Sequence, residues 1–163
     1  MCTLIILRGN SGSGKTTVAR ELQKKIGSNT LLISQDVIRR EMLMVKDGPD
    51  TKALPMLKDL LIYGRNHCET VILEGILVAD WYRSLFELAK DLYGNNIYAY
   101  YFDIPFEETI KRHKTRDKCS EFGEETMREW WVDKDYSDLL DEMAITAEKD
   151  LETIVQEIYS TKE

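Results

Sequence analysis

The sequence holds few residues that could cross-link the chain. Its 163 residues include three cysteines, Cys2, Cys68 and Cys119, which show neither a CxxC pair nor a cysteine–histidine spacing. An odd number of cysteines without such spacing argues against a disulfide framework and against a zinc site. We therefore expect reduced thiols, as in a cytoplasmic protein, and a core that needs no disulfide.

Long apolar runs and an excess of basic charge are also missing. The first apolar run, residues 3–7, is too short for a signal peptide or a membrane span. The chain carries 22 basic and 29 acidic side chains, and the resulting net charge of -7 repels polyanions unless a local basic groove overcomes it. We expect no membrane association and regard nucleic acid as a disfavoured partner.

No repeat, low-complexity stretch or linker divides the chain, so we expect one domain over residues 1–163. Short apolar runs predict five strands, at residues 3–7, 30–33, 71–73, 97–102 and 143–146. Between them, apolar residues recur three or four positions apart and predict helices. This alternation predicts an α/β fold, with a five-stranded parallel sheet between helices and ligands at the carboxyl ends of the strands.

The stretch after the fourth predicted strand differs from the rest. Pro105 fits the first turn of a helix that continues to about Arg116, and another helix is expected from Glu124. Residues 117–123 interrupt the apolar periodicity between these two helices. We interpret this region, about residues 112–124, as a short exposed lid.

A phosphate-binding pattern follows the first predicted strand. Residues 9–16 read GNSGSGKT and satisfy GxxxxGK[ST] between a predicted strand and a predicted helix. In this pattern, backbone N–H groups cradle phosphates, the lysine reaches the β- and γ-phosphates, and the last hydroxyl ligates magnesium. We therefore predict ATP and Mg²⁺ as cofactors, with Lys15 catalytic and Thr16 on the metal. The predicted nucleotide-binding residues are Gly9, Asn10, Ser11, Gly12, Ser13, Gly14, Lys15, Thr16 and Thr17.

Two carboxylates follow predicted strands. Asp36 comes just after the second strand, and Glu74 ends the third. A carboxylate at the carboxyl edge of the sheet can orient or take the proton of an acceptor hydroxyl, or hold a magnesium-bound water. Structural alternatives stay open, because Asp36 also suits a helix N-cap and the alternative role of Glu74 is only to terminate a strand.

With these features, nearly the whole chain resembles the small nucleoside, nucleotide and polynucleotide kinases. Polynucleotide kinases and zeta-type toxins carry an acid after this strand, often with an arginine three residues on, as Asp36 and Arg39 do. Glu74 and the Gly-Ile-Leu after it are similar to an element of uridine kinases, although Val37 and Ile38 replace the aromatic residues of those enzymes. The resemblance implies that Asp36, Arg39 and Glu74 bind the acceptor, that Asp36 is also catalytic, and that Glu74 also contacts the metal.

Arginines and tryptophans supply further candidates. Arg112 and Arg116 resemble the Rx3R motif of kinase lids, which implies that Arg112 contacts the nucleotide and Arg116 neutralises charge on the transferring phosphoryl group. A solvated charge run is the alternative interpretation. Trp81, Trp130 and Trp131 either line an acceptor pocket by stacking or belong to the core.

We predict an ATP-dependent phosphotransferase that moves the γ-phosphate to a hydroxyl group of a small molecule, with a nucleoside such as uridine as the leading candidate. A kinase for a polynucleotide 5′-hydroxyl or a sugar nucleotide, similar to zeta toxins, is the first alternative. A non-catalytic nucleotide-binding protein is the second, because a phosphate-binding loop alone would serve it. The identity of the acceptor and the oligomeric state stay open.

Overall fold

The computed structural model describes residues 1–115 and 122–163. Its strands are β1 (Thr3–Gly9), β2 (Thr30–Ser34), β3 (Thr70–Gly75), β4 (Ile97–Phe102) and β5 (Glu142–Ile145). The helices are α1 (Lys15–Ile26), α2 (Gln35–Val37), the π-helical turn η1 (Ile38–Met42), α3 (Ala53–His67), α4 (Arg83–Tyr93), α5 (Phe106–Lys114), α6 (Glu124–Trp130) and α7 (Leu151–Lys162). No helix among these is long and apolar enough to cross a membrane.

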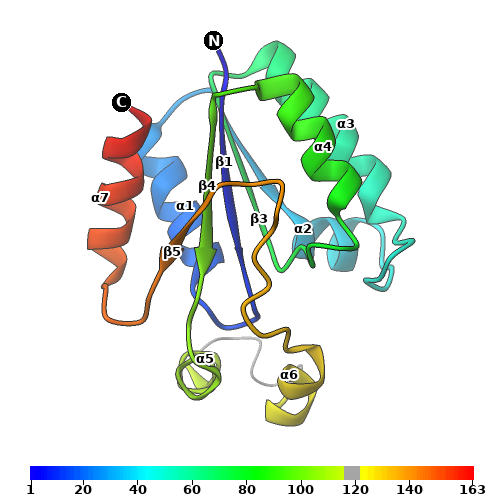
Figure 1. Ribbon diagram of the computed structural model, residues 1–163, viewed down its shortest axis with the longest axis vertical. Helices are drawn as coiled ribbons and strands as arrows, with labels where there is room; N and C mark the ends of the chain where they lie inside the picture. Colours follow the sequence, from blue (N-terminus) through cyan, green and yellow to red (C-terminus); the bar gives the residue numbers. More distant parts are fainter. Residues whose placement is uncertain (116–121) are drawn as a thin grey trace.

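The five strands form one parallel sheet in the order β2-β3-β1-β4-β5. Figure 1 shows α1 and α7 on one face of this sheet and α3 and α4 on the other. The predicted α/β fold, with its five-stranded parallel sheet between helices, is therefore confirmed. The carboxyl ends of the strands meet at one edge, beyond which α5 and α6 lie.

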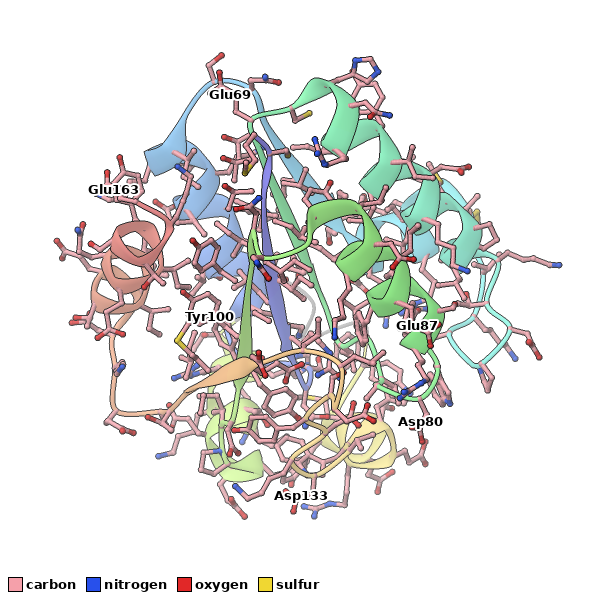
Figure 2. All side chains as sticks on the ribbon, turned by 45° about the horizontal axis from the view of Figure 1, so that its top comes forward. Glu69, Asp80, Glu87, Tyr100, Asp133 and Glu163 are labelled. Atoms are coloured by element: carbon pink, nitrogen blue, oxygen red, sulfur yellow. The ribbon has the colours of Figure 1, made fainter. Side chains whose placement is uncertain are left out.

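Alternating side chains of β1 supply both halves of the core. Leu4 and Ile6 pack with α3 and α4, whereas Ile5 and Leu7 pack with α1 and α7, and all four are fully buried. Tyr100 of β4, labelled in Figure 2, belongs to the core on the α7 side. Because both faces are covered, the strands have continuous apolar sequences and were recognisable as short apolar runs.

Several local predictions differ from the structure. Pro105 is the N-cap residue of α5, one position before the first turn in which it was expected, because its ψ of 147° is extended rather than helical. Ser34 is the N-cap residue of α2, so the alternative role of Asp36 as an N-cap is wrong. Arg116 and most of the loop interpreted as a lid lie outside the described residues.

A buried arginine joins three segments at the carboxyl edge. Arg8 of β1 is fully buried, and its guanidinium donates hydrogen bonds to the carbonyl oxygen of Leu77 at 3.1 and 2.9 Å. It also donates to the carboxylates of Asp135 at 2.9 Å and Glu142 at 2.5 Å. Asp135 in turn accepts from the backbone N–H of Ala79 at 2.9 Å. Arg8 therefore holds the chain beyond β3, the segment before β5, and β5 itself against β1.

We predict that Arg8→Met lowers the free energy of unfolding by about 3–5 kcal/mol, because it leaves the buried carboxylate of Glu142 and the partly buried carboxylate of Asp135 without their cation. Urea unfolding followed by circular dichroism measures this loss. Lys24→Met is the matched control, since Lys24 pairs with Glu21 on the exposed surface of α1 and its loss should be nearly neutral. A loss below about 1 kcal/mol for Arg8→Met would show that these ion pairs do not hold the edge together.

Candidate active site

Glycines shape the loop between β1 and α1. Gly12 has a φ of +78° and Gly14, the N-cap residue of α1, has a φ of +97°. Both values lie in the left-handed region, which glycine adopts without strain. A Cβ atom on Gly12 would also stand 2.7 Å from the carbonyl oxygen of Thr109. The loop can therefore lie close against α5, with the positive end of α1 at its exit.

Polar groups inside this loop fit phosphate. The Ser13 side chain is 1 % exposed, and its Oγ has no hydrogen-bond partner among the residues that the structure describes. Lys15 is also buried, and its Nζ donates to the carbonyl oxygen of Asn10 at 3.1 Å. A buried hydroxyl without a partner is costly in a folded protein. Phosphate oxygens would give Ser13 its acceptor, and the ammonium of Lys15 is the cation that this motif directs at phosphate, so the loop fits a nucleotide.

The end of β3 carries a buried carboxylate beside the loop. Glu74 is 2 % exposed and accepts hydrogen bonds from Thr16 Oγ1 at 3.1 Å and from Ser34 Oγ at 2.6 Å. The register of the sheet places Ser34 of β2 directly beside Glu74. Carboxylate and hydroxyl oxygens are the hard ligands that Mg²⁺ prefers in proteins. The donor set therefore fits a magnesium ion next to the phosphate-binding loop.

Asp36 lies in α2, directly after β2. Its Oδ1 accepts hydrogen bonds from Arg39 Nη2 at 3.1 Å and from Arg40 Nε at 2.8 Å. Arg39 Nη1 also donates to the carbonyl oxygen of Val45 at 3.3 Å. These charge-assisted bonds fix the orientation of the carboxylate, whose side chain remains 30 % exposed.

A single cavity of about 880 Å³ connects these groups. This volume lies in the upper part of the range of roughly 300–1,000 Å³ that is typical of small-molecule sites. Its lining includes the following predicted residues: Ser11, Gly12, Ser13, Gly14, Lys15, Thr16, Thr17, Asp36, Arg39, Glu74 and Arg112. Gly9 and Asn10 do not line it.

The tryptophans divide between the cavity and the packing of the helices. Trp81 and Trp130 line the cavity, with 36 % and 38 % of their surfaces exposed. The guanidinium carbon of Arg40 lies 5.5 Å from the centroid of the Trp130 ring, so the planar guanidinium extends the flat surface of the ring. Trp131 is not part of the lining and instead packs edge-on against Phe106, with ring centroids 5.3 Å apart.

Asn10 and Arg112 bond the phosphate-binding loop to the segments around it. The amide of Asn10 donates to the carbonyl oxygen of Val132 at 2.7 Å and accepts from the Val132 N–H at 3.0 Å. Arg112 Nη1 donates to the carbonyl oxygen of Ser13 at 2.7 Å. The loop is thus joined to α5 and to the chain that leaves α6 (Figure 1).

A hydrogen-bonded chain at the cavity wall was not recognised from the sequence. Gln35 Nε2 donates to Tyr82 Oη at 2.9 Å, and Tyr82 Oη donates to Asp47 Oδ1 at 2.6 Å. Burial and the bond to Asp47 raise the pKa of Tyr82 well above its usual value, so the phenol keeps its proton and remains a donor. No sequence motif marks Gln35 or Asp47. The one sequence feature that points to these hydrogen bonds is the aromatic residue Tyr82 after β3.

Fold and loop together define a P-loop nucleotide-binding protein. The model of the AAA domain family matches residues 4–131, and the chain belongs to this family. A comparison with curated protein sequences finds no match.

Solved structures share the fold. A gluconokinase from Sinorhizobium meliloti 1021 aligns with a TM-score of 0.66 and 19 % identity, over 97 % of this chain and 90 % of that chain. The APS kinase from Mycobacterium tuberculosis, in complex with AMPPNP and APS, aligns with a TM-score of 0.65 and 18 % identity, over 97 % and 95 %. The shikimate kinase from Acinetobacter baumannii, in complex with shikimate, aligns with a TM-score of 0.59 and 19 % identity, over 99 % and 96 %.

We predict that Asn10→Ala lowers the free energy of unfolding by about 1–3 kcal/mol, because both backbone groups of Val132 lose their partners. Hydrogen exchange should show faster exchange at the Val132 amide. The matched control is Asn66→Ala, since Asn66 is exposed on α3 and the change should leave Val132 unaffected. Unchanged protection of Val132 in Asn10→Ala would mean that this bond does not hold the segment after α6.

Proposed function

We propose that this protein is a P-loop kinase that transfers the γ-phosphate of ATP to a hydroxyl group of a small molecule. One observation carries the proposal: Lys15, Thr16, Glu74 and Asp36 all line the same cavity. In the same cavity as the phosphate-binding loop, Arg39 and Arg40 hold the carboxylate of Asp36. A protein that only binds nucleotide does not need such a carboxylate. The shared fold with proteins named gluconokinase, APS kinase and shikimate kinase supports the same activity.

The residues have separate tasks on the phosphate side. Backbone N–H groups of the loop and the ammonium of Lys15 bind the β- and γ-phosphates and stabilise the charge of the transition state. Thr16 and Glu74 would hold Mg²⁺, which neutralises phosphate charge when bound. Arg112 is bonded to the loop at Ser13 and would contact the nucleotide. The role of Arg116 in neutralising the transferring group remains a prediction.

Asp36 acts on the acceptor side. Its carboxylate accepts the proton of the acceptor hydroxyl as the oxygen attacks the γ-phosphorus and ADP leaves. Arg39 and Arg40 keep the carboxylate oriented for this transfer, and Arg39, which lines the cavity, would also contact the acceptor. Because the proton moves from the hydroxyl to Asp36, no additional base is required.

A nucleoside such as uridine is the acceptor that we propose to test first. The Glu74-Gly-Ile-Leu element resembles that of uridine kinases, and Ile76 lines the cavity beside Glu74. Trp81 and Trp130, each about one-third exposed on the cavity wall, supply faces on which a base can stack.

We expect Lys15→Ala to lower phosphate transfer at least ~100-fold, because the loop loses the charge that bridges the transferring phosphates. The assay follows transfer from labelled ATP to nucleosides, sugars and 5′-hydroxyl oligonucleotides, with ATP alone as a blank. Lys90→Ala, at an exposed position of α4, should retain full activity. Transfer to the oligonucleotide alone would favour a polynucleotide kinase, and ATP binding without transfer to any acceptor would favour a nucleotide-binding role.

Asp36→Asn tests the proposed base. Asparagine keeps the shape and the oxygen that Arg39 and Arg40 contact, but it does not accept the proton, so the transfer rate should fall about 10²–10⁴-fold. ATP affinity, measured by calorimetry, and the melting temperature should stay close to those of the wild type. Asp91→Asn, exposed on α4, is the control for the change in charge. Wild-type turnover in Asp36→Asn would make this carboxylate structural.

A further inference from the structure

We propose that the acceptor carries an anionic group, a phosphate or a carboxylate, and that Lys46 binds it. This inference rests on the proposed function, because it concerns the acceptor half of the same cavity. The observation behind it is that Lys46 lines the cavity and belongs to a loop, between η1 and α3, that several hydrogen bonds hold in place.

Hydrogen bonds hold the chain at Val45, at Lys46 and at the side chain of Asp47. Val45 exchanges two hydrogen bonds with Arg39, from the Val45 N–H to the Arg39 carbonyl at 2.9 Å and from Arg39 Nη1 to the Val45 carbonyl at 3.3 Å. Asp47 accepts from Tyr82 Oη at 2.6 Å. The carbonyl oxygen of Lys46 itself accepts from Thr51 Oγ1 at 2.9 Å. Hydrogen bonds at three consecutive residues, 45–47, therefore fix this part of the loop.

The anchor at Asp47 reaches the core of the protein. Tyr82 is fully buried and also bonds Gln35, which is 2 % exposed. A Cβ atom on Gly75 would stand 2.8 Å from the Cβ of Gln35, so α2 lies directly against the end of β3. Movement of Asp47 would break a buried chain of hydrogen bonds. The loop is thus preorganised, which lowers the entropy cost of binding a ligand through it.

Lys46 is exposed to solvent and lines the cavity. Within residues 1–115 and 122–163, its ammonium makes no ion pair or hydrogen bond. The adjacent carboxylate of Asp47 is engaged by Tyr82, and that of Asp36 by Arg39 and Arg40. An anionic group of an acceptor in the cavity would therefore meet an ammonium that has no competing carboxylate partner among these residues, on a loop that is already ordered.

Arg39 connects this position to the proposed base. One terminal nitrogen of its guanidinium bonds Asp36, and the other bonds the carbonyl of Val45, next to Lys46. An acceptor with its hydroxyl at Asp36 can therefore extend along Arg39 until its anionic group meets Lys46. Its flat part would lie against Trp81 and Trp130, which line the same cavity. A phosphorylated nucleoside or an aromatic hydroxy acid fits these demands better than a neutral nucleoside.

Matched compounds that differ only in charge test the inference. One set is uridine, uridine 3′-monophosphate and uridine 5′-monophosphate, and the other is benzyl alcohol, 4-(hydroxymethyl)benzoate and 4-(hydroxymethyl)phenyl phosphate. Calorimetry in the presence of AMPPNP measures binding without chemistry. We expect at least one anionic member to bind at least ~10-fold more tightly than its neutral parent, as a charge-assisted hydrogen bond allows. The phosphate and carboxylate members distinguish the two anions.

Lys46→Gln should abolish this preference and leave the binding of the neutral parent unchanged. In transfer assays it should raise KM for the anionic acceptor and change kcat less than about threefold, because only ground-state binding is lost. Lys52→Gln is the matched control, because this substitution removes the same charge from an exposed residue that does not line the cavity. Tyr82→Phe should weaken the preference without removing any charge, since it releases the anchor at Asp47.

The outcomes separate this inference from the proposed function. If no anionic member binds more tightly than its neutral parent, or if the preference survives Lys46→Gln, the inference is overturned while the kinase proposal can still stand on transfer to neutral acceptors. If Lys46→Gln removes the preference but no compound receives phosphate from labelled ATP, Lys46 binds an anion and the proposed transfer is wrong.

Discussion

The buried guanidinium of Arg8 constrains everything at the carboxyl edge of the sheet. It directly precedes Gly9, the first residue of the phosphate-binding loop, and it bonds Leu77, Asp135 and Glu142. Arg8 and Glu142 are buried and Asp135 is partly buried, so these charges are stable only when each meets its partner, and the segments that carry them must come together. The chain after β3 that leads to Trp81, and the chain before β5, consequently take fixed paths past the site.

Each half of the cavity has its own supports. Asn10 joins the phosphate-binding loop to Val132, which follows the tryptophan pair at the end of α6, and Arg112 joins α5 to the same loop at Ser13. On the other side, Tyr82 connects α2 with the loop that carries Lys46. A rigid wall on each side is what a transfer reaction requires, because the attacking oxygen and the γ-phosphate must be held in line.

Much of the fold and part of the site could be predicted because the information is local. The loop GNSGSGKT is contiguous, and the strands are apolar runs covered on both faces. Asp36 follows β2 and Glu74 lies at the end of β3, and the carboxyl ends of these strands share one edge. The N-cap alternative for Asp36 was wrong because Ser34 occupies that position, a choice of a single residue that propensity does not resolve. The single domain and the role of Arg116 stay predictions.

The class of fold, the phosphate-binding loop and the two carboxylates could be predicted from the chain, since each depends on neighbours within a few positions. The bonds of Asn10 to Val132, of Arg8 to Glu142 and of Tyr82 to Asp47 could be seen only in the folded molecule. These pairs lie 122, 134 and 35 positions apart along the chain. No local period or spacing encodes such contacts, because they arise when packing of the sheet and helices brings distant polar groups into one buried space where each must find a partner.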